Sequence, residues 1–213
     1  MKPCVDSIEF LNAVSVEQMR KSDKYTIDNF TESKVLMYRA AEGVYSSFDW
    51  KNKNIAIVCG SGNNGGDGYA LAGILAENGY ACHIYRVSER FSDDGLYYYN
   101  EALKKGVGTS VFDGSTELSG YDVIVDCILG TGFKGEPKDK VKKAIEMINN
   151  STAYVISVDI NSGLNGDDGS AVLAVKSDLT VSIGFYKKGL FLGRAPLMIG
   201  ELVNVDIGIV LCE

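Results

Sequence analysis

The sequence predicts an α/β fold in which helices flank both faces of a mostly parallel central sheet, as a three-layer αβα sandwich. Apolar runs of strand length alternate with segments of helical periodicity, which is the pattern of parallel strands joined by right-handed crossovers. The run from Ile55 to Cys59 has no polar residue, as in a strand covered on both faces. Gly60, Gly62 and Gly65 follow with the spacing G-x-G-x-x-G, which lets a backbone turn tightly and approach an anion at a helix N-terminus.

Before this unit, residues 15–48 are expected to form two helices, and residues from about 53 to 209 the core around the sheet. Ser15 is the expected cap of the first helix, with Val16, Met19, Ile27 and Phe30 on its apolar side. The charged residues of that helix are expected on a solvated face: Arg20, Lys21, Asp23 and Lys24. The other expected elements are strands near 81–87, 108–112, 121–126, 154–158, 179–183 and 202–205, a helix at 92–104 capped by Ser92, and a helix with Pro137 in its first turn.

Composition limits the class of protein. A chain of 213 residues, 46% hydrophobic and with 24 glycines, suits a single domain, residues 1–213. Its 21 basic and 28 acidic side chains give a net charge of -7, which argues against a broad nucleic-acid or anionic-membrane surface. The N-terminus lacks the continuous apolar segment of a signal peptide and no later run approaches a membrane span, so a cytoplasmic location is expected.

Three cysteines and the only histidine are expected to be structural. Cys59, Cys82 and Cys127 lie in or beside strand-like runs without C-x-x-C spacing, as expected of reduced core residues. His83 lies within the second strand, where a core or edge histidine is the simplest interpretation. Arg86 stands where a dinucleotide dehydrogenase would place an acid, so an ordinary dehydrogenase is disfavoured and Arg86 is interpreted as a surface residue.

Polar residues follow three strands at their carboxyl ends. Asn63, Asn64 and Asp67 come after the first strand, Asp126 ends a later apolar run, and Asp159 ends the next, with Ser162 behind it. Because these ends share one edge of a parallel sheet and meet near the point where strand order reverses, the side chains should converge.

The convergence has three interpretations. Carboxylate, amide and hydroxyl oxygens are the ligands of a hard cation. One aspartate could instead be poised as a general acid and base. Each aspartate could also be a helix cap or turn residue. In the glycine-bounded loops, Lys187 and Lys134 are ordinarily surface residues, yet either could meet a phosphate or carry a proton.

At these motifs the chain resembles the NAD(P)H-hydrate epimerase family, the YjeF N-terminal domain, from about residue 14 to residue 209. The motifs that carry the resemblance are GSGNNGGDG at 60–68, VDCILGTGFKG at 125–135, VDINSG at 158–163, KKGL at 187–190 and GELVNVDIGI at 200–209. It implies a Rossmann-like sheet, in a protein that is usually a homodimer. It also implies an isomerase that interconverts the R and S forms of hydrated NADH and NADPH, so that a separate dehydratase can restore the cofactor.

The resemblance also implies roles by position. The hydrate, as substrate, would contact Asn63, Asn64, Gly65, Gly66, Asp67, Gly130, Thr131, Gly132, Phe133, Lys134, Gly135, Glu136 and Asp159. One potassium ion per subunit would be held by Asn64, Asp126 and Ser162, which agrees with the oxygen-ligand argument. The chain departs from the family at Asn161 and Lys188, where proline is usual, and at Tyr38, where glutamate is usual.

Inversion at the hydrated ring carbon requires proton transfer to oxygen and no redox step. The hydroxyl sits on a carbon bonded to nitrogen, so water can leave and return through an iminium, or the ring can open and reclose. The hypothesis is that Asp159 is the acid and base, assisted by Lys187 or Lys134. The alternative function is a non-catalytic nucleotide-sensing or protein-interaction module on the same fold.

Overall fold

The sheet of this protein has seven strands, all parallel, in the order β3-β2-β1-β4-β5-β6-β7. The structure is a computed structural model and describes residues 12–212. Most of the N-terminal segment, in which the sequence shows no apolar run of the kind found in a signal peptide, therefore lies outside the described residues. The strands are β1 (Ile55–Cys59), β2 (Cys82–Arg86), β3 (Gly108–Val111), β4 (Val123–Cys127), β5 (Tyr154–Val158), β6 (Ser177–Ile183) and β7 (Ile199–Val205).

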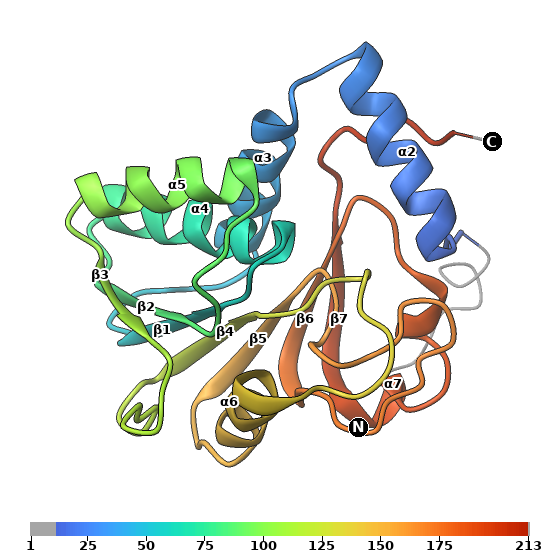
Figure 1. The fold of residues 1–213 in the computed structure, drawn as a ribbon. Helices are drawn as coiled ribbons and strands as arrows, with labels where there is room; N and C mark the ends of the chain where they lie inside the picture. Colours follow the sequence, from blue (N-terminus) through green and yellow to red (C-terminus); the bar gives the residue numbers. More distant parts are fainter. Residues whose placement is uncertain (1–11, 213) are drawn as a thin grey trace.

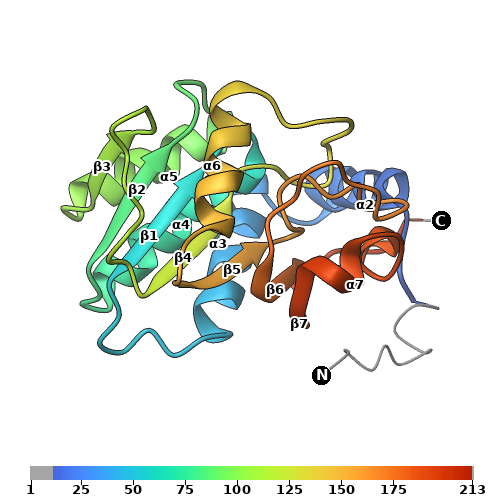
Figure 2. The ribbon, with the colours of Figure 1, turned by 90° about the horizontal axis from the view of Figure 1, so that it is seen from below.

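Helices cover both faces of the sheet, which confirms the α/β sandwich (Figures 1 and 2). The helices are α2 (Val16–Asn29), α3 (Ser33–Ser46), α4 (Asn63–Glu77), α5 (Asp93–Lys104), α6 (Asp139–Asn149) and α7 (Ala195–Met198), with a short 3-10 turn at Lys188–Leu190. Figure 1 shows α3, α4 and α5 on one face and α6 on the other. Alternate side chains of β1 enter the two cores: Ile57 packs on the first side, and Val58 on the second.

The first helix, α2, differs from the expected amphipathic pattern. Ser15 caps it as expected, its Oγ accepting the N–H of Gln18 at 3.1 Å, and Met19 is buried. Ile27 and Phe30, however, are 39% and 61% exposed, so the expected apolar stripe is wrong in its second half.

The buried side of that half carries hydroxyls instead. Ser22 Oγ accepts the N–H of Cys212 at 3.0 Å, and Thr26 Oγ1 accepts the N–H of Val210 at 2.9 Å. The C-terminal segment therefore covers this face through backbone hydrogen bonds, which apolar side chains could not have accepted.

The helix expected to hold Pro137 in its first turn begins later. Its N-cap is Lys138 and its first residue is Asp139, so Pro137 precedes the helix as a buried residue of the connecting loop. The other expected strands and helices lie within a few residues of their ranges, whereas α7 and the 3-10 turn at Lys188–Leu190 were not expected. Within residues 12–212, no helix combines the length and apolar character that crossing a membrane requires.

Candidate active site

Strand order reverses between β1 and β4, and the candidate site lies there. Val58 of β1 is in register with Asp126 of β4, which is in register with Ser157 of β5. The segments that follow these strands border a pocket of about 540 Å³. The predicted site residues that line the pocket are Asn63, Asn64, Asp67, Gly130, Thr131, Gly132, Phe133 and Asp159. The structure therefore brings together the groups that the sequence places far apart.

The glycine turn after β1 is tight because two of its glycines have no room for a side chain. A Cβ on Gly60 would lie 1.9 Å from the carbonyl oxygen of Ile128, and one on Gly65 would lie 2.2 Å from the carbonyl oxygen of Gly60. At Gly62, in contrast, a Cβ would meet no other atom within 4 Å, and this glycine borders the pocket. Helix α4 begins at Asn63, immediately after Gly62, so its positive end opens on the pocket.

The residues of the motif divide between the pocket, which its polar side chains line, and the core, where two of its glycines lie. Asn63 is exposed, Asn64 is 6% exposed, and Asp67 is half-buried, and all three line the pocket. Gly65 and Gly66 are buried and do not line it; a Cβ on Gly66 would lie 2.5 Å from the methyl group of Met37. These two glycines permit close packing beneath the pocket.

Asp126 is fully buried beside the pocket and accepts four hydrogen bonds. Its Oδ1 accepts the hydroxyl of Ser162 at 2.5 Å and the N–H of Ile128 at 3.2 Å. Its Oδ2 accepts the N–H of Ser162 and the hydroxyl of Ser157, both at 2.9 Å. Burial raises the pKa of Asp126 above its ordinary value, while these hydrogen bonds act in the opposite direction and favour the carboxylate.

Asn64 joins the same network through the backbone of Leu129. Asn64 Nδ2 donates to the carbonyl of Leu129 at 3.0 Å, and the N–H of Leu129 donates to Ser162 Oγ at 2.8 Å. The side chains of Asn64, Asp126 and Ser162 therefore converge on one short segment, as expected from the strand ends.

The oxygen atoms gathered at Asn64, Asp126 and Ser162 are of the type that binds a hard cation. The side-chain oxygen of Asn64 is buried and accepts no hydrogen bond from residues 12–212, which is costly for a polar atom unless a ligand occupies the position. The buried carboxylate of Asp126 also forms no ion pair with a described basic residue. Amide, hydroxyl, carbonyl and carboxylate oxygens suit a hard cation. In the described part of the chain no cluster of three or more His, Cys, Asp or Glu side chains could hold a metal ion, so a zinc-type site is not supported there.

Asp159 borders the pocket and Lys187 lies behind it. Lys187 is 1% exposed, and its ammonium donates to Asp159 Oδ1, to the carbonyl of Ile183 at 2.7 Å and to Ser182 Oγ at 3.4 Å. Asp159 has a φ of 69°, a left-handed conformation that is uncommon for residues other than glycine. Its Oδ2 points to the turn after β4 and lies 3.5 Å from where a Cβ on Gly130 would stand. The sequence allowed Lys187 either a surface or a functional position, and the structure buries it against a pocket carboxylate.

Lys134 is not brought to the same pocket. It is exposed, its Nζ is 4.0 Å from Asp167 Oδ2, and it borders a separate hollow together with Gly135 and Glu136. Phe133 lines both hollows. The proposed contacts of residues 134–136 with the substrate, and the assisting role of Lys134, stay predictions.

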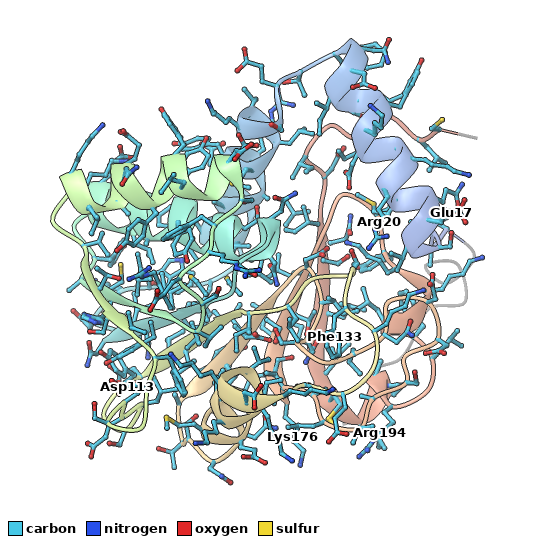
Figure 3. The ribbon with its side chains drawn as sticks, viewed as in Figure 1. Glu17, Arg20, Asp113, Phe133, Lys176 and Arg194 are labelled. Atoms are coloured by element: carbon cyan, nitrogen blue, oxygen red, sulfur yellow. The ribbon has the colours of Figure 1, made fainter. Side chains whose placement is uncertain are left out.

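Two residues of α2 that the sequence assigns to a solvated face line the pocket: Arg20 is exposed, as expected, whereas Asp23 is half-buried. Arg20 and Asp23 border it, whereas Lys21 and Lys24 are exposed and pair with Glu17 and Asp28 on the outer side. The signal for Asp23 was present, because it follows the apolar Met19 by four residues and so shares its side of the helix. Figure 3 shows Arg20 on the side of α2 that faces the sheet, above the loop that carries Phe133.

Carboxylates are therefore concentrated in the pocket. Burial, and then repulsion from Asp159, raise the pKa of Asp23 to about 6, while Lys187 lowers it. The pKa of Asp67 is raised well above its ordinary value by burial first and next by the charge of Asp159, with a lowering contribution from Lys187. Lys187 is thus the cation that offsets three neighbouring carboxyl groups.

The residues interpreted as structural have structural partners. His83 Nε2 lies 2.9 Å from Ser110 Oγ, and burial lowers its pKa. Cys59 and Cys127 are free and buried, and Cys82 is free and half-buried. Arg86 is half-buried with its Nε inside the protein, so the interpretation as a surface residue holds only in part, and its guanidinium lies 5.4 Å and 5.1 Å from the ring centroids of Phe91 and Tyr99.

Asn161, where the family usually has proline, is fully buried and braces the loop before Ser162. Its Nδ2 donates to the carbonyl of Val175 at 3.0 Å, and its Oδ1 accepts the hydroxyl of Thr180 at 2.7 Å. These hydrogen bonds stiffen the loop by a different means from a proline ring.

The chain is similar to known proteins over most of its length. Residues 33–189 match the family described as YjeF-related protein N-terminus. The chain is 32% identical to the NAD(P)H-hydrate epimerase of Elusimicrobium minutum, over 93% of this chain and 96% of that protein. It is 33% identical to the NAD(P)H-hydrate epimerase of Oenococcus oeni, over 92% and 96%.

A second kind of relative is longer. The chain is 33% identical to the bifunctional NAD(P)H-hydrate repair enzyme Nnr of Coxiella burnetii over 90% of its residues, and it spans 40% of that protein. Among solved structures, the crystal structure of yeast ynu0, YNL200c, has a TM-score of 0.72 over 90% of this chain and 86% of the other, at 20% identity, which is a likeness of fold. Because the family match covers more than half of the residues, and relatives above 30% identity span nearly all of them, this chain belongs to the YjeF-related N-terminal family.

Proposed function

We propose that this protein is an NAD(P)H-hydrate epimerase, which interconverts the R and S epimers of hydrated NADH and NADPH. The observation that carries the proposal is Asp159, a pocket carboxylate supported from behind by the buried ammonium of Lys187. The names of the relatives that match this chain nearly end to end support the same activity.

The reaction moves a hydroxyl between the two faces of a ring carbon that is bonded to nitrogen. In one route a proton is added to the hydroxyl oxygen, the C–O bond breaks, and the nitrogen lone pair forms an iminium. Water then adds to the opposite face and returns the proton. In the other route the hydroxyl loses its proton as a C=O bond forms and the C–N bond breaks, and the nitrogen takes the electron pair and a proton. The nitrogen then attacks the opposite face of the carbonyl, loses that proton, and the oxygen regains one. Both routes need one group that gives and takes a proton, and neither changes the oxidation state.

Asp159 has the features of such a group. One carboxylate oxygen is held by Lys187 and the other lies toward Gly130, in the turn that borders the pocket. Its left-handed backbone conformation is of the kind that functional sites retain when the surrounding structure determines it. We assign the proton transfer to Asp159, and to Lys187 the role of orienting this carboxylate and supplying charge.

The remaining pocket residues are assigned to binding. The start of α4 and the turn at 130–133 offer backbone groups to the phosphates and ribose of the dinucleotide. Asn64, Asp126 and Ser162 would hold the potassium ion with the carbonyl of Leu129. When bound there, the ion would supply positive charge beside the turn at 130–133.

Three further features of the proposal concern the whole protein. The bifunctional relatives support functional coupling to a dehydratase. A homodimer and a cytoplasmic location stay predictions of the sequence.

Epimer exchange, followed by chromatography of the separated R and S hydrates, tests the function. Asparagine tolerates a left-handed conformation, so Asp159→Asn removes the proton-transfer group with little change of backbone. We expect a loss of about 10²- to 10⁴-fold in rate at saturating substrate. The control is Asp28→Asn, an exposed carboxylate of α2 paired with Lys24, which should keep the wild-type rate.

Two results would contradict the proposal in different ways. A wild-type protein that binds the dinucleotide without exchanging its epimers would support the nucleotide-sensing alternative. An Asp159→Asn variant with an undiminished rate would leave the enzyme in place and remove Asp159 from its chemistry.

A further inference from the structure

The pocket has an unusual balance of charge for a site that would accept an anionic dinucleotide. Four carboxyl groups line it: Asp23, Asp67, Asp94 and Asp159. Arg20 is the basic side chain among the lining residues in the described part of the chain. Lys187 does not border the pocket and is already engaged with Asp159. The net negative charge of this pocket would repel a diphosphate unless a basic side chain pairs with the phosphate oxygens.

Arg20 is available for that role. Within residues 12–212 it forms no ion pair at 4.0 Å or less, whereas the two lysines of the same helix pair with carboxylates: Lys21 with Glu17 at 2.7 Å, and Lys24 with Asp28 at 2.7 Å. The outward cations of α2 are therefore neutralised, and the inward one is not.

The guanidinium of Arg20 lies against the glycine turn after β4. Its Nη2 is 2.9 Å from where a Cβ on Gly132 would stand, so the missing side chain of Gly132 is what makes room for it. Gly132 and its neighbours Gly130 and Thr131 line the pocket as well. A guanidinium beside a turn of exposed backbone suits an oxyanion, because its N–H groups can bind phosphate oxygens in pairs.

The backbone that carries the exposed side chain of Arg20 is fixed by the rest of the fold. Met19 beside it is buried, and a Cβ on Gly184 would lie 2.8 Å from the methyl group of Met19. The N–H of Val16, at the start of α2, donates to Asp167 Oδ1 at 2.8 Å. The other half of α2 is bound to the C-terminal segment through Ser22 and Thr26. Helix α2 is thus fixed at both ends, and its inward face can hold a ligand group in place.

We infer that Arg20, set against Gly132, binds a phosphate group of the dinucleotide and thereby determines how tightly the substrate is held. The inference rests on the proposed function for the identity of the ligand. It concerns binding, so it predicts an effect on affinity and KM, with kcat little changed.

Calorimetric titration with NAD and NADP, both lacking the hydrate, separates this inference from the epimerase activity. Arg20→Gln should weaken the binding of at least one dinucleotide by about 10- to 100-fold, as expected for the loss of a charge-assisted pair of hydrogen bonds. Lys21→Gln is the matched control: it removes the same charge from the adjacent residue on the outer face, and should change the Kd less than about 2-fold.

The two dinucleotides identify the phosphate. An equal loss for both assigns Arg20 to the diphosphate, and a loss for NADP alone assigns it to the 2′-phosphate. Arg20→Lys should restore only part of the affinity, because an ammonium does not form the paired geometry.

A second variant tests the contact with Gly132. Gly132→Ala would place a methyl group within 2.9 Å of Nη2, and the flexible guanidinium is what would move. Its effect on affinity should largely disappear in the Arg20→Gln background, as in a double-mutant cycle of coupled residues.

Three results would overturn the inference: a wild-type protein that binds neither dinucleotide, an Arg20→Gln variant with unchanged affinity, or an equal loss in Lys21→Gln. If binding depends on Arg20 while no epimer exchange is detected, the inference stands and the proposed function fails.

Discussion

The ammonium of Lys187 donates to the carboxylate of Asp159 from beneath the pocket, although each residue follows a different strand of the sheet. Lys187 is held there because the backbone on either side of it pairs with Val14: the N–H of Val14 donates to the carbonyl of Tyr186 at 2.8 Å, and the N–H of Lys188 donates to the carbonyl of Val14 at 3.0 Å. The buried ammonium of Lys187 requires a carboxylate and a carbonyl as acceptors, here Asp159 and Ile183, because an unpaired charge away from water is very costly.

Replacing this lysine should damage both activity and stability. In Lys187→Met the length of the side chain is nearly kept, but Asp159 loses the cation that offsets its charge. We expect epimer exchange to fall by about 10²-fold or more. The free energy of unfolding should fall by at most about 3 kcal/mol, since Asp159 retains contact with solvent.

Exchange kinetics and urea unfolding measure these effects, and Lys188→Met is the control. Lys188 is the exposed neighbour, and its replacement should leave both quantities near the wild-type values. A Lys187→Met protein of wild-type activity would show that the ammonium is structural only.

Potassium should stabilise the folded protein through Asn64. An ion present at about 100 times its Kd adds about 2.7 kcal/mol to stability. The melting temperature of the wild type should therefore rise when lithium chloride is exchanged for potassium chloride at equal ionic strength. Asn64→Ala removes the buried oxygen that lacks a hydrogen-bond partner, and the response should be lost.

Asn63→Ala serves as the comparison, because Asn63 is the exposed adjacent residue in the same turn of α4. It should melt with the wild-type dependence on potassium. If all three proteins respond equally, the ion does not bind at Asn64.

Asp23 should make stability depend on pH in a defined direction. Its pKa rises from an ordinary value of 3.8 to about 6 on folding. A carboxyl group that binds its proton more tightly in the folded state lowers stability as the pH rises through this window. Asp23→Asn removes that loss, so the variant should exceed the wild type by on the order of 1 kcal/mol above pH 6, after allowance for its partial exposure.

Urea unfolding between about pH 4 and pH 7 tests this, with Asp28→Asn as the exposed control on the same helix. The advantage of Asp23→Asn should shrink as the pH falls from about 6 to about 4, because the wild-type carboxyl becomes protonated in both states towards the lower end of this range. An advantage that stays constant across the range would mean that Asp23 does not titrate there. Because Lys187 lowers the pKa of Asp23, the effect should increase in a Lys187→Met background.

Much of the fold follows from local patterns in the sequence. The unbroken apolar run at Ile55–Cys59 and the glycines after it predict a buried parallel strand and a tight turn, and the structure contains both. Asp126 and Asp159 were expected to meet at one edge because strand ends share an edge in any parallel sheet. The network through Leu129 bears out that convergence for Asn64, Asp126 and Ser162.

The order of strands and helices along the chain follows from the sequence alone, because hydrophobic periodicity decides it. The set of polar groups at the strand ends follows as well, because the direction of the chain decides which residues come after each strand. Which charged residues face the pocket depends instead on tertiary packing. Arg20 and Asp23 point inward because the C-terminal segment covers the hydroxyl side of α2, more than 180 residues away in the chain. Lys187 is buried and Lys134 exposed, although both lie in glycine-bounded loops, because only Lys187 has its flanking backbone paired with Val14. Such contacts depend on which segments pack together in three dimensions, and no local pattern encodes them.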